Sequence, residues 1–117
     1  MTFLPTLASG SVAGKPILVA ATSSPGTTLH TATAETDAAG LDEIWIWAAN
    51  NHSAAVSLTF QFGDTANKDS IEQSVPSKAG TFLLIPGMRL NAGAIVKAYA
   101  TTADVISCVV SVNRYVA

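Results

Sequence analysis

Charged residues are scarce in this chain of 117 residues. Asp, Glu, Lys and Arg together make up 12% of it, about half of their usual share. The six basic residues form no cluster that could neutralise a run of phosphates, and the formal net charge is -2 at pH 7. The composition therefore argues against nucleic-acid binding. Hydrophobic residues make up 49%, which excludes global disorder, because disordered chains combine low hydrophobicity with high charge.

Cysteines and long apolar runs are also missing. The single cysteine, Cys108, can form no internal disulfide. The most apolar stretch, residues 105–112, is far shorter than the about 20 residues that span a membrane. The first ten residues contain no Lys or Arg, and Pro5 interrupts their apolar patch, so they do not match a secretory signal. We expect no membrane association.

Candidate catalytic groups are few. The chain has two histidines, His30 and His52, and no Gly-x-Ser-x-Gly motif that would present a serine nucleophile. Cys108 lies among apolar residues of a predicted strand, which favours a buried, inert thiol. His30 lies among threonines, which favours a hydrogen-bonded strand histidine. The sequence therefore predicts no catalytic residue and a protein that is not an enzyme.

Oxygen ligands occur in two places. One loop contains Asp64, Asn67 and Asp69, but their spacing does not match an EF-hand, so a solvated turn is favoured over a calcium site. A second group of carboxylates lies within residues 35–43, at Glu35, Asp37, Asp42 and Glu43, and a solvated loop is the usual meaning of such a run. With one cysteine and no pair of closely spaced histidines, the sequence predicts no metal and no cofactor.

Short strand patterns separated by turn residues fill most of the chain. Residues 1–15 show no periodicity and are expected to form an extended N-terminal arm before a single domain of residues 16–117. About eight antiparallel strands with no convincing helix predict an all-β, jelly-roll-like β-sandwich. The expected strands are residues 16–22, 27–33, 41–50, 54–63, 71–75, 80–85, 94–100 and 105–115.

The clearest alternation lies in residues 54–63. It predicts one core-facing set, Val56, Leu58, Phe60 and Phe62, and one solvent-facing set, Ser57, Thr59 and Gln61. A short polar link at residues 50–53 predicts that this strand forms a hairpin with residues 41–50. Pro86 and Gly87 predict a sharp turn that ends the strand at residues 80–85.

Two indoles, Trp45 and Trp47, share one face of the strand at residues 41–50, and Ile44 and Ile46 share the other. Three interpretations remain open. The indoles fill the core while the isoleucines face outward, or they anchor a protein interface, where Trp is enriched, or they form a platform that stacks on sugar rings. Both faces being apolar favours a central strand or an outer face covered by a partner.

The low charge and the N-terminal segment favour an oligomer. Charged residues are depleted at the centres of protein interfaces, and here Ala, Ser and Thr take their place. Pro5 disfavours a helix or a central strand in the arm. We therefore expect the arm to reach across a neighbour. The predicted interface consists of Phe3, Leu4, Pro5, Leu7, Trp45 and Trp47.

Several segments together resemble the small β-sandwich virion proteins of tailed bacteriophages. They are TLHTA (28–32), DEIWIWAAN (42–50), LTFQFG (58–63), LIPGMRL (84–90) and VNRY (112–115). The resemblance spans most of the chain from residue 27 onward, and its motifs are strand and turn signatures. It implies a capsid decoration (cement) protein, commonly a homotrimer with an N-terminal arm. Its partner would be the major capsid protein or another virion protein, in a virion assembled in the host cytoplasm.

Two alternatives stay open beside that expectation. One is a carbohydrate-binding or host-recognition β-sandwich module in which Trp45 and Trp47 form the platform. The other is a tail or head-fibre component of the same virion. Burial of both indoles against protein would favour the decoration protein, and two exposed coplanar rings beside polar groups would favour the carbohydrate-binding module.

Overall fold

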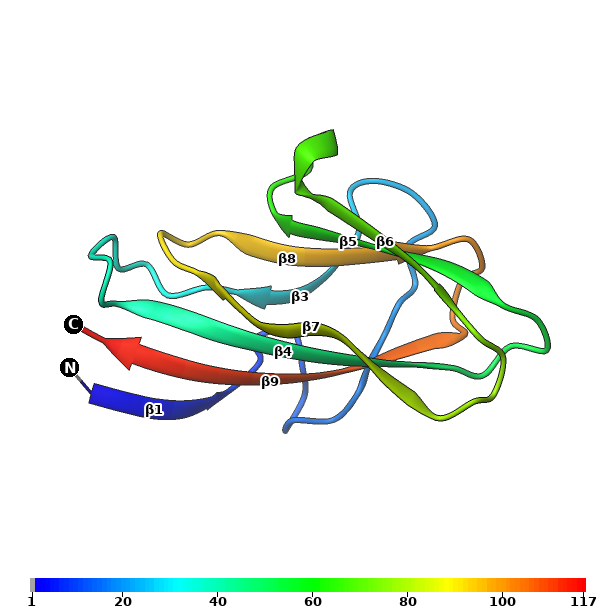
Figure 1. The fold of residues 1–117 in the computed structure, drawn as a ribbon, viewed down its shortest axis with the longest axis horizontal. Coiled ribbons are helices and arrows are strands. Elements are labelled where there is room, and N and C mark those ends of the chain that lie inside the picture. Colours follow the sequence, from blue (N-terminus) through cyan, green and yellow to red (C-terminus); the bar gives the residue numbers. More distant parts are fainter. Residues whose placement is uncertain (1) are drawn as a thin grey trace.

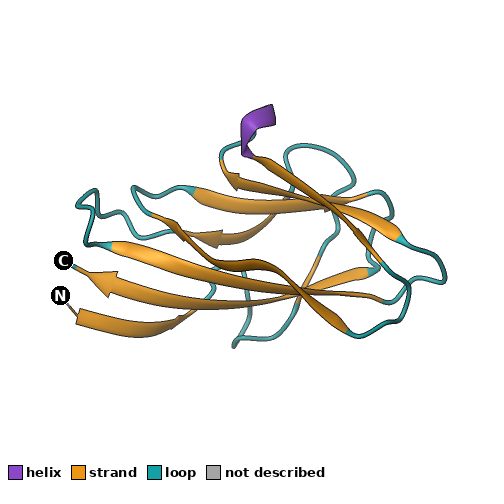
Figure 2. Ribbon diagram, in the orientation of Figure 1, coloured by secondary structure: helices purple, strands orange, loops and turns teal. Residues whose placement is uncertain are grey.

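Two antiparallel β-sheets pack face to face in the computed structural model, which describes residues 2–117 (Figures 1 and 2). The all-β prediction is confirmed. The elements are β1 (Thr2–Leu7), β2 (Ile17–Leu18), β3 (Thr27–Thr31), β4 (Leu41–Asn50), β5 (Val56–Gly63), the 3-10 turn η1 (Asn67–Asp69), β6 (Ser70–Val75), β7 (Thr81–Leu90), β8 (Ile95–Ala100) and β9 (Ile106–Val116). The described chain contains no helix with the length and apolar character that a membrane crossing requires.

The strand order is that of a jelly roll. The first sheet has the order β1-β9-β4-β7, with β2 also paired to β9, and the second has the order β3-β8-β5-β6. The pairs β2–β9, β3–β8, β4–β7 and β5–β6 are all antiparallel and are nested about the loop between β5 and β6. Nested pairs of this kind are one long hairpin rolled into two sheets, the arrangement that viral capsid and lectin domains share.

The predicted hairpin between the strands at residues 41–50 and 54–63 is wrong. The strand β4 pairs with β7 and β9, whereas β5 lies in the other sheet and pairs with β6 and β8. The polar link between them turns the corner from one sheet to the other. Asn50 holds this corner, because its Nδ2 donates to the carbonyl oxygens of Ala54 (3.0 Å) and Val75 (2.9 Å).

The core lies between the sheets and is built from alternate residues of the central strands. Ile44 and Ile46 of β4 and Leu58 and Phe60 of β5 are fully buried, and Phe62 packs against them while remaining partly exposed. Core-facing residues of β5 are therefore predicted correctly. The alternation is a local property of the chain, so it does not depend on which strands pair.

The prediction that the opposite face of β5 is open to water is wrong. Thr59 and Gln61 are 5% and 1% exposed. The loop at residues 20–26 covers this face, because Gln61 Oε1 accepts the N–H of Gly26 (2.8 Å) and its Nε2 donates to Ser24 Oγ (2.8 Å). A polar side chain that is fully hydrogen-bonded is buried here without an unpaired group.

The strand β7 continues through Pro86 and Gly87, where the sequence predicted a turn. Ile44 lies opposite Met88, but Trp45 lies opposite Pro86, so Gly87 is the extra residue of a β-bulge. Its φ is +75°, and an added Cβ would lie 2.8 Å from Cζ2 of Trp45. Only glycine allows both the backbone angle and the close packing of the indole.

The segment predicted to be an extended N-terminal arm instead begins with a strand of the first sheet. Residues 2–7 form β1, an edge strand that pairs with β9 of the same chain (Figure 1). Pro5 is compatible with this position because one side of an edge strand needs no hydrogen-bond donors. The rings of Phe3 and Tyr115 lie 5.2 Å apart between centroids. Met1, the first residue of the predicted arm, lies outside the described residues.

Candidate interaction surface

One face of the β1–β9–β4–β7 sheet points away from the second sheet, and we call it the outer face. Phe3 and Leu41 lie on either side of Tyr115. Trp47 lies between Val109 and Leu83. Since successive side chains of a strand alternate, these residues share one side of the sheet. The apolar residues of the outer face are Phe3, Pro5, Leu7, Leu41, Trp45, Trp47, Leu83, Pro86, Val109 and Tyr115.

This face exposes more apolar surface than isolated side chains would. Leu7 is 65% exposed, Phe3 51%, Leu83 43% and Val109 37%. Single exposed apolar residues are ordinary, but several of them on one sheet face are the usual mark of an interaction site.

The structure brings five of the six predicted interface residues onto this one surface. Phe3, Pro5 and Leu7 reach it from β1, and Trp45 and Trp47 reach it from β4. Leu4 does not share it, because its alternate position in β1 places it on the same side of the sheet as its partner Arg114. The sequence contains no signal that β1 and β4 contribute to one surface. The strand that pairs with both of them, β9, is the last in the chain.

The interpretation of the indoles as core residues is wrong. Ile44 and Ile46 are fully buried, whereas Trp45 and Trp47 are half-buried on the outer face. Trp45 is held in place by its packing on Gly87 and by a hydrogen bond from its Nε1 to Glu43 Oε1 (3.0 Å). This indole is a fixed part of the surface.

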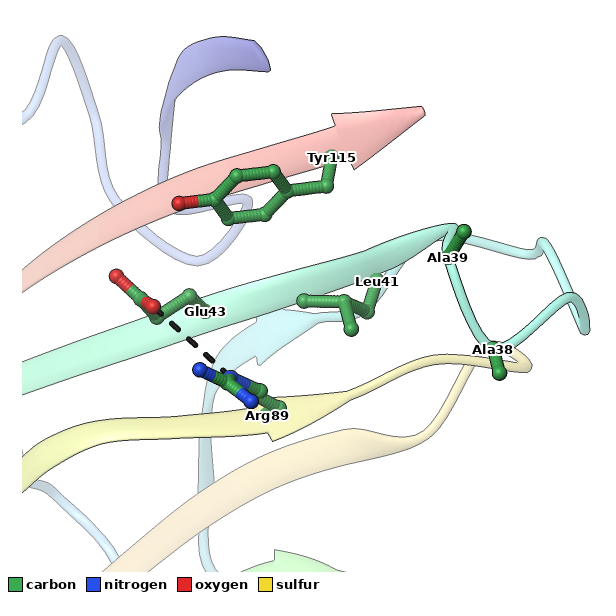
Figure 3. Close-up of a pocket in the computed structure, with 6 residues that line it drawn as sticks. All are labelled: Ala38, Ala39, Leu41, Glu43, Arg89 and Tyr115. Atoms are coloured by element: carbon green, nitrogen blue, oxygen red, sulfur yellow. Dashed lines mark ion pairs between the residues drawn. The ribbon is translucent and has the colours of Figure 1, made fainter. Parts of the chain in front are cut away.

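One pair of opposite charges interrupts the apolar surface. Glu43 Oε2 and Arg89 Nε are 4.0 Å apart. Hydrogen bonds from Trp45 and Asn113 lower the pKa of Glu43, which therefore stays ionised at neutral pH. A hollow of about 350 Å³ lies beside the pair (Figure 3). Its lining residues are Ala38, Ala39, Leu41, Glu43, Arg89 and Tyr115.

A buried polar cluster lies on the other side of the same strand. Asp42 is fully buried, so its predicted place in a solvated acidic loop is wrong. Arg114 Nε donates to Asp42 Oδ1 (2.8 Å) and its Nη2 to Oδ2 (3.0 Å), while the N–H of Thr33 also donates to Oδ2 (3.0 Å). His30 Nε2 lies 2.7 Å from Oδ2. Asp42 is buried because its alternate position on β4 faces inward, where a bidentate guanidinium meets it.

The residue types Ser9, His30 and Asp42 match a serine-protease triad, but their arrangement does not. The backbone N–H of Ser9, not its hydroxyl, donates to His30 Nδ1 (2.9 Å). The proton of the imidazole therefore sits on Nε2 and is donated to Asp42. Ser9 Oγ accepts the N–H of Thr31 (2.7 Å). With both ring nitrogens occupied and the side chain 1% exposed, His30 fastens the segment after β1 to β3.

Burial and pairing act on the pKa of Asp42 in opposite directions. Burial alone would raise it, but the hydrogen bonds from Arg114 and His30, together with the charge of Arg114, outweigh burial and hold it below the ordinary value. The carboxylate is thus a charged structural group within the fold.

Within residues 2–117, no three His, Cys, Asp or Glu side chains lie close enough together to hold a metal ion. In the loop that contains Asp64, Asn67 and Asp69, Lys68 Nζ lies 2.8 Å from Asp69 Oδ1.

We expect Cys108 to resist thiol reagents in the folded protein. It is fully buried, and burial raises its pKa from 9.0 to about 12. Since the thiolate is the reactive form, a rise of this size makes labelling on the order of a thousandfold slower than in the unfolded chain. Labelling with a chromogenic disulfide at pH 8, with and without 6 M guanidinium as the denatured control, measures the ratio. Equal rates would contradict the assignment.

Comparison of this chain with protein-family models, with curated proteins and with solved structures finds no match.

Proposed function

We propose that this protein is a structural subunit of a bacteriophage virion, a capsid decoration protein that attaches to the coat-protein shell through the outer face. The observation that carries the proposal is the set of apolar side chains that β1, β9, β4 and β7 present on the outer face. The resemblance of the strand and turn segments to small phage virion proteins supplies the class of partner. The fold alone does not decide, because jelly rolls serve many functions.

The charge of the outer face suits an uncharged partner surface. Glu43 and Arg89 stand opposite each other in the register, so their charges cancel within the face. The other described residues of the face carry no charge, so this part gains from burial without needing a complementary potential on the partner, while the Glu43–Arg89 pair stays open to solvent. The partner patch on the coat protein is therefore expected to be apolar and weakly charged.

The size of the face favours attachment as an oligomer. The strands β4, β7 and β9, of 10 or 11 residues each, and β1, of 6 residues, together cover roughly 600 Å². A standard stable interface buries about 800 Å² on each partner, so one copy alone would bind weakly. A homotrimer on a repeating shell engages several faces at once, and this raises the overall affinity without new contacts. We therefore include the homotrimer in the proposal.

Point variants on the outer face test the attachment. Leu7→Ser, Trp47→Ser and Val109→Ser, combined in one chain, remove apolar area from three strands. Sedimentation with coat-protein shells of the phage that encodes the protein should show at least a hundredfold weaker binding, because each lost side chain contributes about 1 kcal/mol or more. Thermal melting confirms that the variant is folded. The matched control is Tyr99→Ser, whose neighbours Ala98 and Ala100 face the core, so that Tyr99 lies on the far side of the other sheet.

Undiminished binding of the triple variant would refute attachment through this face. Removal of residues 1–14 is a poorer test than point variants. The truncation deletes β1 and also Ser9, whose backbone N–H donates to His30 Nδ1. Lost binding would therefore not be separable from lost structure.

We expect light scattering to give the mass of a trimer for the purified chain at micromolar concentration. A trimer presents several weakly binding faces to the shell at once, and the low charge of the chain suits an interface between subunits. A monomer mass at that concentration would contradict the oligomer. Measurements at several ionic strengths serve as the control, because an apolar contact changes little with salt, whereas a charged contact weakens.

A further inference from the structure

The hollow in the outer face lies where β4 begins and β9 ends, since Leu41 is the first residue of β4 and Tyr115 is next to the last residue of β9. Figure 1 shows these two strand ends side by side. Figure 3 shows Tyr115 of β9, Leu41 of β4 and Arg89 of β7 side by side across three adjacent strands, with the loop before β4 closing one end. Its volume of about 350 Å³ falls at the small end of the range for ligand sites, about 300–1,000 Å³. It has room for one ring-sized group.

The carboxylate of Glu43 is held in place by hydrogen bonds, but Glu43 and Arg89 keep further capacity for hydrogen bonds to a ligand. Glu43 Oε1 accepts hydrogen bonds from Trp45 Nε1 (3.0 Å) and Asn113 Nδ2 (3.3 Å), which fix the carboxylate. Its Oε2 is 4.0 Å from Arg89 Nε, too far for a hydrogen bond. The Arg89 side chain is 67% exposed. The acceptor Glu43 Oε2 and the donor groups of the Arg89 guanidinium are therefore separated by a gap that a ligand hydroxyl can bridge.

We propose that this hollow binds a neutral saccharide through one ring. A hydroxyl group both donates and accepts, so adjacent hydroxyls satisfy Glu43 Oε2 and the guanidinium of Arg89 together. The apolar face of the ring lies against Tyr115 and Leu41. Since the charges of Glu43 and Arg89 cancel, the site gives no preference for a charged ligand. Few, well-placed polar groups on an apolar lining are the usual composition of a small-molecule site.

An apolar side chain of a docking protein suits the hollow less well. It would cover Glu43 and Arg89 without offering them hydrogen bonds, and the burial of an imperfectly paired carboxylate and guanidinium is unfavourable. A ring bearing hydroxyls removes that cost. This difference favours a saccharide over a protein anchor. Shell attachment then uses the part of the outer face around Leu7, Trp47 and Val109 and leaves the hollow open.

The probes are methyl glycosides of common hexoses, pentoses and N-acetylhexosamines at millimolar concentration. Saturation-transfer NMR on the intact protein detects the bound sugar, and indole fluorescence reports on Trp45 beside Glu43. The expected result is binding of at least one glycoside, weakened about tenfold or more by Glu43→Gln and by Arg89→Ala, because a hydrogen bond to a charged group is lost in each. Tyr115→Ala is expected to weaken binding about tenfold through the lost stacking surface.

Matched controls are Glu72→Gln, Lys78→Ala and Tyr99→Ala, which change a carboxylate, a cation and a phenol elsewhere on the exposed or half-buried surface. Glu43→Gln and Arg89→Ala keep the apolar strand contacts, so melting temperature separates binding loss from unfolding. The absence of binding by every glycoside, or binding that Glu43→Gln and Arg89→Ala leave unchanged, would overturn the proposal. Weaker shell attachment on Ala39→Trp without any sugar binding would also overturn it, and would assign the hollow to a protein side chain.

Discussion

Replacement of Phe60 by alanine is expected to lower the free energy of unfolding by about 3–5 kcal/mol, the usual cost of removing a buried aromatic ring. Phe60 is fully buried in the middle of β5 and lies opposite Ala98 of β8 and Ile71 of β6. Ala98 is too small to fill the space that the ring leaves. Both neighbouring strands are held by ladder hydrogen bonds, so the site collapses little and most of the cavity remains.

Urea unfolding followed by tryptophan fluorescence measures the loss. The matched control is Phe62→Ala, two residues along the same face of β5, where the ring is only partly buried. We expect the control to cost clearly less, because less apolar area leaves water there on folding. An unchanged urea midpoint for Phe60→Ala would show that the assignment of this face to the core is mistaken.

Replacement of Asp42 by alanine is expected to cost about 3 kcal/mol, the lower end of the range for breaking a buried ion pair. The change leaves His30 Nε2, the N–H of Thr33 and the Arg114 guanidinium without their common acceptor. Arg114 keeps 30% of its side chain exposed and can regain water, which is why the lower end applies. His30 has no such route, since it is 1% exposed.

The pH dependence of stability gives a second readout of the same cluster. The folded-state pKa of Asp42 lies below the ordinary value of 3.8. A group of this kind contributes stability that is fully present above the unfolded pKa and is lost as the pH falls through the folded pKa. The wild-type chain should therefore lose stability more steeply below about pH 4 than Asp42→Ala does.

Urea midpoints measured from pH 7 to pH 2 compare the two chains. Asp42→Asn keeps the shape of the side chain and isolates the effect of the charge, and Glu72→Gln removes an exposed carboxylate as the control. Parallel pH profiles for the wild type and Asp42→Asn would contradict a charged, stabilising Asp42.

The alternation of side chains could be read correctly from the sequence. It placed Val56, Leu58 and Phe60 in the core and put Trp45 and Trp47 on one face of a central strand. These properties follow from the two-residue period of a β-strand, which each segment carries by itself. The all-β class follows in the same way, from many such segments separated by turn residues.

The pairing of the strands was decided only by the tertiary structure. Chain proximity suggested a hairpin of β4 with β5, but β4 lies between β9 and β7, whose residues are distant in sequence. The burial of Asp42 has the same origin, because its partner Arg114 is 72 positions away. The residues of the outer face and its hollow come together only when β1, β9, β4 and β7 align. A local pattern specifies which side of a strand is apolar, whereas the partner depends on contacts summed over the whole chain, and these form only in the folded state.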